Sequence, residues 1–302
     1  MRGGAIPRSL RDMIRALPES LRCLREPWFP PEVSAHLQGY IRFATSISDR
    51  DGVLHACRYV SGGAGTIIEE RVDAQTYREL KELIAREYLP SEYSDEAGDE
   101  LRAFLSARGV ELALGKRRIP AEVYTTTREA YGILPAEHLG HGHFRRLVLG
   151  GWGHGAARCS EFDDPDVHMF TFAVTGPRRN FAALLLHETG HACFARMAET
   201  DKGIADKLHG CLRALRKRAP ASMLDADTRV MPFAVDYLFG PASRVEEVIT
   251  NVQEFAAEAY LRYVVRGVGL KDAIADMEPA LAEPWRTAYE IFKESFGGVE
   301  YS

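Results

Sequence analysis

The feature that most constrains the fold is an apolar run that leads directly into a cluster of polar side chains. Residues 180–186 read Asn-Phe-Ala-Ala-Leu-Leu-Leu, and His-Glu-Thr-Gly-His follows at 187–191. The residues of the run favour a helix, and their apolar character predicts that this helix is buried. Two His and one Glu on a buried helix are costly unless they are paired or bound to a metal ion.

The spacing within the polar cluster is typical of a metal site. His187 and His191 are four residues apart, so their imidazoles lie on one face of a helix and can reach one Zn²⁺ ion at about 2.0–2.1 Å. Glu188 is next to the first imidazole, where it can take a proton from an activated water molecule. The alternative interpretation is a helix that carries two surface histidines with ordinary hydrogen bonds.

Gly190 adds a packing constraint, because it lies between the two histidines in the middle of the expected helix. A glycine at such a position costs about 1 kcal/mol relative to alanine. We therefore expect Gly190 to admit a neighbouring element in close contact with this helix.

An acidic helix is predicted farther along the chain. A capping box at Ser243 and Glu246 precedes it. The polar face of this helix carries Glu247, Asn251, Glu254 and Glu258. Such a stripe is either a solvated face or, because alanines flank the acids, part of a packed and buried helix. A catalytic zinc site needs three protein ligands and a water molecule, and this helix can supply the third ligand.

These two segments together resemble the zincin metallopeptidases whose third ligand is a glutamate. Within that group the chain is most similar to the catalytic domain of anthrax lethal factor, the Pro-Pro endopeptidases and the Mlc titration factor. The resemblance rests on the HETGH motif and on Glu-Phe-Ala-Ala-Glu-Ala-Tyr at 254–260. It covers residues 110–302, whereas the first hundred residues resemble no family that we recognise.

The resemblance implies roles for the acids of the second helix. Glu254 would be the third zinc ligand, with Glu258 and Glu247 as alternatives. Glu258 would then accept a hydrogen bond from a ligand histidine and fix the tautomer of that imidazole. Peptide-bond hydrolysis by an endopeptidase, with Zn²⁺ as cofactor and Glu188 as general base, follows from the resemblance.

One departure from the family concerns the transition state. The family has a catalytic Tyr about seven residues before the glutamate ligand, where this chain has Glu247. Tyr237 lies just before the helix and is our candidate for stabilising the oxyanion, although a core position is the alternative for it. His209 is a second candidate. The missing Tyr motivates another hypothesis, a zinc-binding protein-interaction or effector domain without catalysis.

The order of predicted elements indicates an α+β fold, because strands are followed by a long helical part from residue 178 onward. We expect a zincin-like domain over 106–302, with a small mixed sheet, an active-site helix and a mainly helical C-terminal part. An N-terminal α/β region of unknown role would occupy 1–105. Strands are expected at 53–60, 66–72, 109–114, 121–126, 144–149 and 167–174, and helices at 74–88 and 98–108.

The expected partner is a protein or peptide substrate. The resemblance implies that the strand at 167–174 is an edge strand, along which a substrate would bind in extended form. The net charge of −5 and the pI near 6.1 argue against nucleic acid and anionic membranes as partners. The sequence does not define the oligomeric state.

The cysteines and the apolar segments bear on the compartment. Five scattered Cys without a CxxC pair argue against a disulfide framework and favour a reducing environment. Neither a signal peptide nor an 18-residue apolar stretch is found, so we expect a cytoplasmic protein without a membrane span, with signal-independent export as the alternative.

Two further patterns could bind metal. His138, His141, His143 and His154 gather before the site, and they form either a second metal site or a solvated loop. Cys159 either caps the zinc as a thiolate or is an inert buried side chain.

Overall fold

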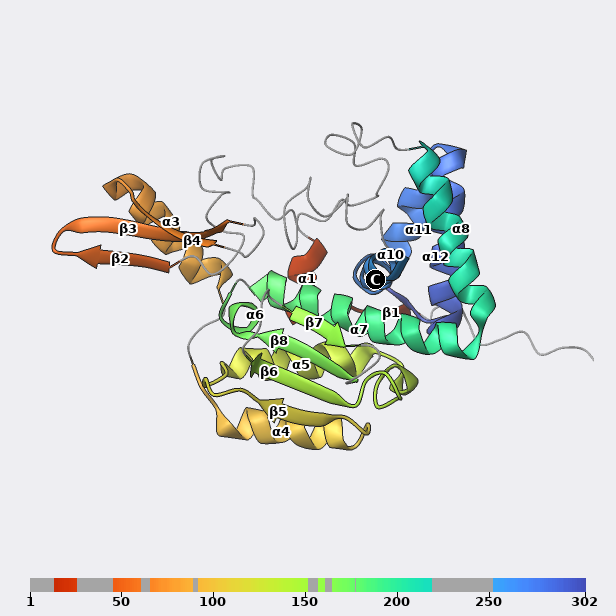
Figure 1. Ribbon diagram of the computed structural model, residues 1–302, viewed down its shortest axis with the longest axis horizontal. Coiled ribbons are helices and arrows are strands. Elements are labelled where there is room, and N and C mark those ends of the chain that lie inside the picture. The colour runs from red at the N-terminus through yellow and green to blue at the C-terminus, as the bar shows by residue number, and fades with distance from the viewer. Residues whose placement is uncertain are drawn as a thin grey trace, which may run out of the picture.

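The computed structural model describes residues 14–25, 46–60, 66–88, 92–151, 157–160, 165–176, 178–218 and 252–302. A three-stranded sheet with one helix lies to one side of a larger body, which contains a four-stranded sheet and the long helices (Figure 1). The described part of the chain is therefore a mixed α and β structure, as the order of elements predicted.

The smaller part is an antiparallel sheet in the order β2-β3-β4, followed by α3. Its elements are β2 (Ser46–Arg50), β3 (Val53–Val60), β4 (Thr66–Arg71) and α3 (Ala74–Glu87). Asp51 and Gly52 both have positive φ in the tight turn between β2 and β3, a conformation that suits a two-residue hairpin. The hairpin expected from residues 53–60 and 66–72 is confirmed by the antiparallel pairing of β3 with β4, and the helix expected at 74–88 is confirmed by α3.

The larger part is built on a mixed sheet in the order β5-β6-β8-β7. The strands are β5 (Glu111–Leu114), β6 (Arg146–Gly151), β7 (Ala157–Ser160) and β8 (Asp166–Phe170). Strands β5, β6 and β8 are parallel, and β7 is antiparallel to β8. Alternate residues, among them Leu147, Leu149, Val167 and Met169, are fully buried in the main core, so one face of the sheet is packed.

The strand predicted at 121–126 is wrong, because these residues begin helix α5 (Ala121–Ile133). Their β-branched residues favour a strand by propensity, but the helix buries Val123, Ala130 and Tyr131 completely. It packs against α4 (Asp95–Ser106) and against the long helix α7 (Arg178–Thr200). Tertiary packing thus overrides propensity here, and α5 forms the connection that the parallel strands β5 and β6 require.

The strand predicted at 167–174 is only partly correct, and its predicted edge position is wrong. Strand β8 ends at Phe170, and residues 171–175 form the short helix α6 (Thr171–Thr175). It lies inside the sheet, hydrogen-bonded to β6 on one side and β7 on the other. The backbone groups of an interior strand are already paired, so they cannot receive another strand. The edge strands of this sheet are β5 and β7. Strand β7 has only four residues, too few for the alternation of Ala157 and Cys159 with polar residues to stand out in the sequence.

The C-terminal part is helical, as expected. It contains α7, α8 (Lys202–Arg218), α10 (Val252–Arg266), α11 (Val268–Ala275) and α12 (Pro279–Ser295). Helix α10 packs across α7, and α12 packs along α8. Helix α7 is buried from Arg179 to Phe194, which confirms the burial that its apolar run predicted. No helix in the described ranges has the length and hydropathy needed to cross a membrane.

The chain ends beside its N-terminal segment. Strand β9 (Glu300–Tyr301) pairs in parallel with β1 (Ile14–Arg15). Helix α1 (Glu19–Arg22) and the 3₁₀ turn η2 (Cys23–Arg25) follow β1 in the chain. Leu17 and Leu21 from this segment, together with Leu105 of α4, belong to the same core as the four-stranded sheet. The division of the chain between residues 105 and 106, at the end of α4, stays a prediction.

Candidate metal centre

The contact between α7 and α10 depends on Gly190. A Cβ at this position would lie 2.9 Å from Ala257 Cα and 3.1 Å from Tyr260 Cβ, which is too close for any larger residue without movement of the backbone. Ala257 and Tyr260, which are three residues apart and both buried, form the opposing face of α10. The close approach expected at Gly190 is therefore confirmed, and it brings the first turn of α10 over the HETGH motif.

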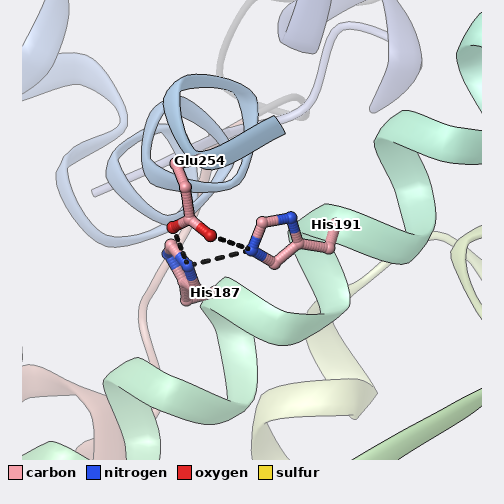
Figure 2. Close-up of side chains that lie close together, drawn as sticks. All are labelled: His187, His191 and Glu254. Carbon is pink, nitrogen blue, oxygen red and sulfur yellow. Dashed lines mark hydrogen bonds and ion pairs between the residues drawn. The ribbon is translucent and has the colours of Figure 1, made fainter. Parts of the chain in front are cut away.

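This approach places Glu254 between the two histidines of the motif (Figure 2). Glu254 Oε2 lies 3.2 Å from His187 Nε2, and Glu254 Oε1 lies 3.3 Å from His191 Nε2. The two Nε2 atoms are themselves 3.2 Å apart. Among the described residues, these three form the one group of His, Cys, Asp or Glu side chains whose geometry could hold a metal ion.

The separation of the two Nε2 atoms, and of each from its nearest Glu254 oxygen, is close to the separation of two ligand atoms on one metal ion. Ligand atoms at 2.0–2.1 Å from a tetrahedral ion are separated from each other by about 3.3–3.4 Å. The two contacts of Glu254 end on different carboxylate oxygens, so an ion beside the two Nε2 atoms would take one or both of these oxygens as its third ligand. One position would be left open. That arrangement, three protein ligands and one open position, is typical of catalytic rather than structural zinc sites.

The electrostatics of the group also suit a cation. His187 is 2% exposed and His191 is 7% exposed, and Glu188 beside them is buried as well. Burial raises the pKa of the Glu254 carboxyl, but the hydrogen bonds and charges of His187 and His191 outweigh it and hold that pKa well below its usual value. Glu254 is therefore an ionised carboxylate, as a metal ligand must be.

Glu258 contacts the opposite edge of the first imidazole. Its Oε2 atom lies 3.6 Å from His187 Nδ1, while its Oε1 atom accepts hydrogen bonds from Arg262 Nε at 3.0 Å and Nη2 at 2.9 Å. Of the two acids, Glu254 thus faces Nε2 and Glu258 faces Nδ1. Arg262 was not singled out from the sequence, although its spacing of four residues from Glu258, among the mostly apolar residues 255–265, is a usable signal.

Several candidates from the sequence are not part of the group. Tyr237, Glu247 and His154 lie outside the described residues. His209 is exposed on α8, and Cys159 lies on the edge strand β7. The role proposed for Tyr237 therefore stays a prediction.

The histidines before the site have partners other than a metal. His138 Nδ1 is 3.1 Å from the Tyr260 hydroxyl, and His138 Nε2 is 3.0 Å from the Ser295 carbonyl oxygen. His143 Nε2 is 2.9 Å from the Glu199 carboxylate. With His141, these residues form no group that could hold a metal in the described part of the chain.

No protein-family model, no curated protein and no solved structure matches the chain. The resemblance to the zincins therefore rests on the HETGH motif and the acidic segment at 254–260. The convergence of His187, His191 and Glu254 is a separate observation, because it depends on how α10 packs against α7.

Proposed function

We propose that this chain is a zinc-dependent endopeptidase with a zincin-like fold, whose zinc is held by His187, His191 and Glu254. The observation that carries the proposal is the convergence of two Nε2 atoms, 3.2 Å apart, with the Glu254 carboxylate, whose two oxygens lie 3.2 and 3.3 Å from them. Two imidazoles and a carboxylate are a donor set that catalytic zinc sites use. The fourth position would be left for water and substrate.

The chemistry needs a Lewis acid and a base. When bound, Zn²⁺ would polarise the scissile carbonyl and lower the pKa of a nearby water molecule. Glu188 follows His187 directly and is 7% exposed, so its carboxylate would act in a site that largely excludes bulk water. Glu188 would take the proton of the attacking water and pass it to the leaving amine. Tyr237 remains the candidate for stabilising the oxyanion.

The substrate would be a peptide in extended form. In this sheet β5 and β7 are each paired on one side only among the described strands, whereas β8 is paired on both sides. Strand β7 also packs against α7, the helix that carries the HETGH motif. A peptide added along β7 would therefore run close to the metal centre.

The decisive experiment compares two substitutions on the same helix. Wild type, Glu188→Gln and Glu199→Gln are purified gently, analysed for zinc and incubated with a peptide library. Glu199 has a side chain that is 74% exposed near the end of α7, so Glu199→Gln is the matched control. We expect stoichiometric zinc in all three proteins and cleavage by wild type and Glu199→Gln only. Wild type without zinc, or full cleavage by Glu188→Gln, would falsify the proposal.

A zinc-binding domain without catalysis is the alternative, favoured by Glu247 at the position where related peptidases have a Tyr. The same experiment separates the two. Full zinc occupancy, no cleavage of any peptide by wild type and a tightly bound partner protein would favour the alternative.

A further inference from the structure

Arg262 is a buried charge one helical turn beyond Glu258 on α10. Its side chain is 2% exposed, and that of Glu258 is 3% exposed. A buried guanidinium is costly unless it is paired and hydrogen-bonded. Glu258 provides that pairing, so the two charges depend on each other.

The two carboxylate oxygens of Glu258 have different neighbours. Arg262 donates from both Nε and Nη2 to the same oxygen, Glu258 Oε1. The other oxygen, Oε2, faces His187 Nδ1 at 3.6 Å. The guanidinium therefore holds one end of the carboxylate while the other end is turned toward a residue of the metal group.

The guanidinium is itself held by the next layer of the core. The Arg262 Cζ atom lies over the ring of Trp285 at 5.5 Å from its centroid. Trp285 is 1% exposed on α12 and packs against Phe255 with ring centroids 5.4 Å apart. Cation–π contact and dense packing leave the Arg262 side chain little freedom.

We propose that Arg262 is a positioning residue for the metal centre, which orients the Glu258 carboxylate toward His187 Nδ1 so that His187 Nε2 presents its lone pair to the ion. The inference rests on the proposed metal site and extends it by two residues, from His187 through Glu258 to Arg262. A ligand histidine that donates its second ring N–H to a fixed carboxylate keeps one tautomer and one ring orientation. Arg262 fixes that carboxylate.

The test is the zinc affinity of the metal-free protein, measured by competition with a chromophoric chelator. Loss of a partner behind a ligand histidine weakens metal binding by about 10–100-fold, which we expect for Glu258→Gln. Arg262→Met should weaken zinc binding to a similar extent. Arg286→Met is the matched control, because Arg286 is on α12 beside Trp285 and 54% exposed, and its zinc affinity should equal that of wild type.

A double variant separates positioning from a general loss of structure. If Arg262 acts through the Glu258 carboxylate, Glu258→Gln/Arg262→Met should bind zinc about as tightly as Glu258→Gln alone, within a few-fold. Effects that are merely structural would multiply instead. The visible spectrum of the Co²⁺-loaded proteins gives a second comparison, because Glu258→Gln and Arg262→Met should alter it in the same way.

The proposal can still be tested if one variant fails to fold. If Arg262→Met alone is insoluble, Arg262→Lys keeps the charge but loses the planar fork, and we expect its zinc affinity to fall between those of wild type and Glu258→Gln. The double variant removes both buried charges together, which proteins often tolerate.

The outcomes distinguish failure of the role proposed for Arg262 from failure of the proposed metal site. Zinc bound by wild type with unchanged affinity in the soluble Arg262 variants, or multiplied losses in the double variant, overturns the positioning role alone. A wild-type protein that binds neither Zn²⁺ nor Co²⁺ overturns the metal site and the positioning role together.

Discussion

Two buried histidine sites lie in the same core and differ in what their ring nitrogens meet. His138 is 4% exposed and His187 is 2% exposed, so burial does not distinguish them. His138 Nε2 faces a carbonyl oxygen, which only accepts, so Nε2 carries the proton and Nδ1 accepts from the Tyr260 hydroxyl. His187 Nε2 instead faces both His191 Nε2 and a carboxylate.

The difference shows how a structural histidine is told from a candidate metal ligand. At His138 each ring nitrogen has one complementary partner, and the hydrogen bonding is complete without an ion. At His187 and His191 three groups that can each offer a lone pair converge on one point, which a shared cation stabilises best. Both sites belong to His-rich stretches of the sequence, and only the geometry separates them.

The largest effect is expected when Glu254, the proposed third ligand, is replaced. Zinc at 1,000 times its Kd stabilises a protein by about 4 kcal/mol, and Glu254→Gln should lose most of that increment because a neutral amide is a poor zinc ligand. Thermal unfolding with zinc and with a chelator measures the increment. His138→Asn is the control and should keep the full increment, whatever its stability without metal. Equal increments in wild type and Glu254→Gln would contradict the assignment of Glu254.

Low pH should destabilise the protein through His138, and this effect needs no metal ion. Burial lowers the pKa of His138 to about 4, against smaller raising effects from the Ser295 hydrogen bond and Glu137. Because the folded pKa is below the unfolded value of 6.5, the stabilisation is complete above pH 6.5 and is lost as the pH falls toward 4. The full loss is about 3 kcal/mol.

Urea unfolding of the metal-free protein at pH 7 and pH 4.5 measures this acid effect. The free energy of unfolding of wild type should exceed that of His138→Asn at pH 7, and this difference should be lost at pH 4.5. His141, whose pKa burial also lowers to about 4, contributes equally to both proteins and cancels in the comparison. An advantage of wild type that is independent of pH would show that His138 is not held neutral by burial.

Gly190→Ala should disturb the candidate metal group, because it changes the packing of α10 against α7. The added Cβ meets the backbone of Ala257, and overpacking costs about 1–3 kcal/mol, which outweighs the gain of about 1 kcal/mol in helix propensity. Displacement of α10 should also weaken zinc binding. Gly210→Ala on α8 is the control, because no atom lies within 4 Å of its added Cβ, and it should stabilise the protein slightly. Denaturant unfolding and zinc titration of both variants test this.

The smallest effect is expected at His143. Its Nε2 atom lies 2.9 Å from the carboxylate of Glu199, whose side chain is 74% exposed, and even a fully charged pair at such a position contributes below about 1 kcal/mol. His143→Gln should therefore change stability by less than about 0.5 kcal/mol and leave zinc affinity unaltered. A large loss of zinc in this variant would restore the second metal site that the cluster of histidines first suggested.

The sequence by itself determined the local features of the site. The spacing of His187 and His191 places both on one helix face because the helical repeat is a local property of the backbone. Burial of that helix followed from its apolar run, and the close contact at Gly190 followed from the absence of a side chain there. The hairpin of β3 and β4 and the helical C-terminal part were also predictable from local patterns.

Only the tertiary structure decided which distant residues meet. Glu254 is 63 residues beyond His191, and its choice over Glu258 depends on where α10 crosses α7. The helical state of residues 121–126 depends on packing between α4 and α7, and the position of β8 inside the sheet depends on its pairing with β7. These features arise from contacts between separate elements, which the sequence pattern within one element does not encode.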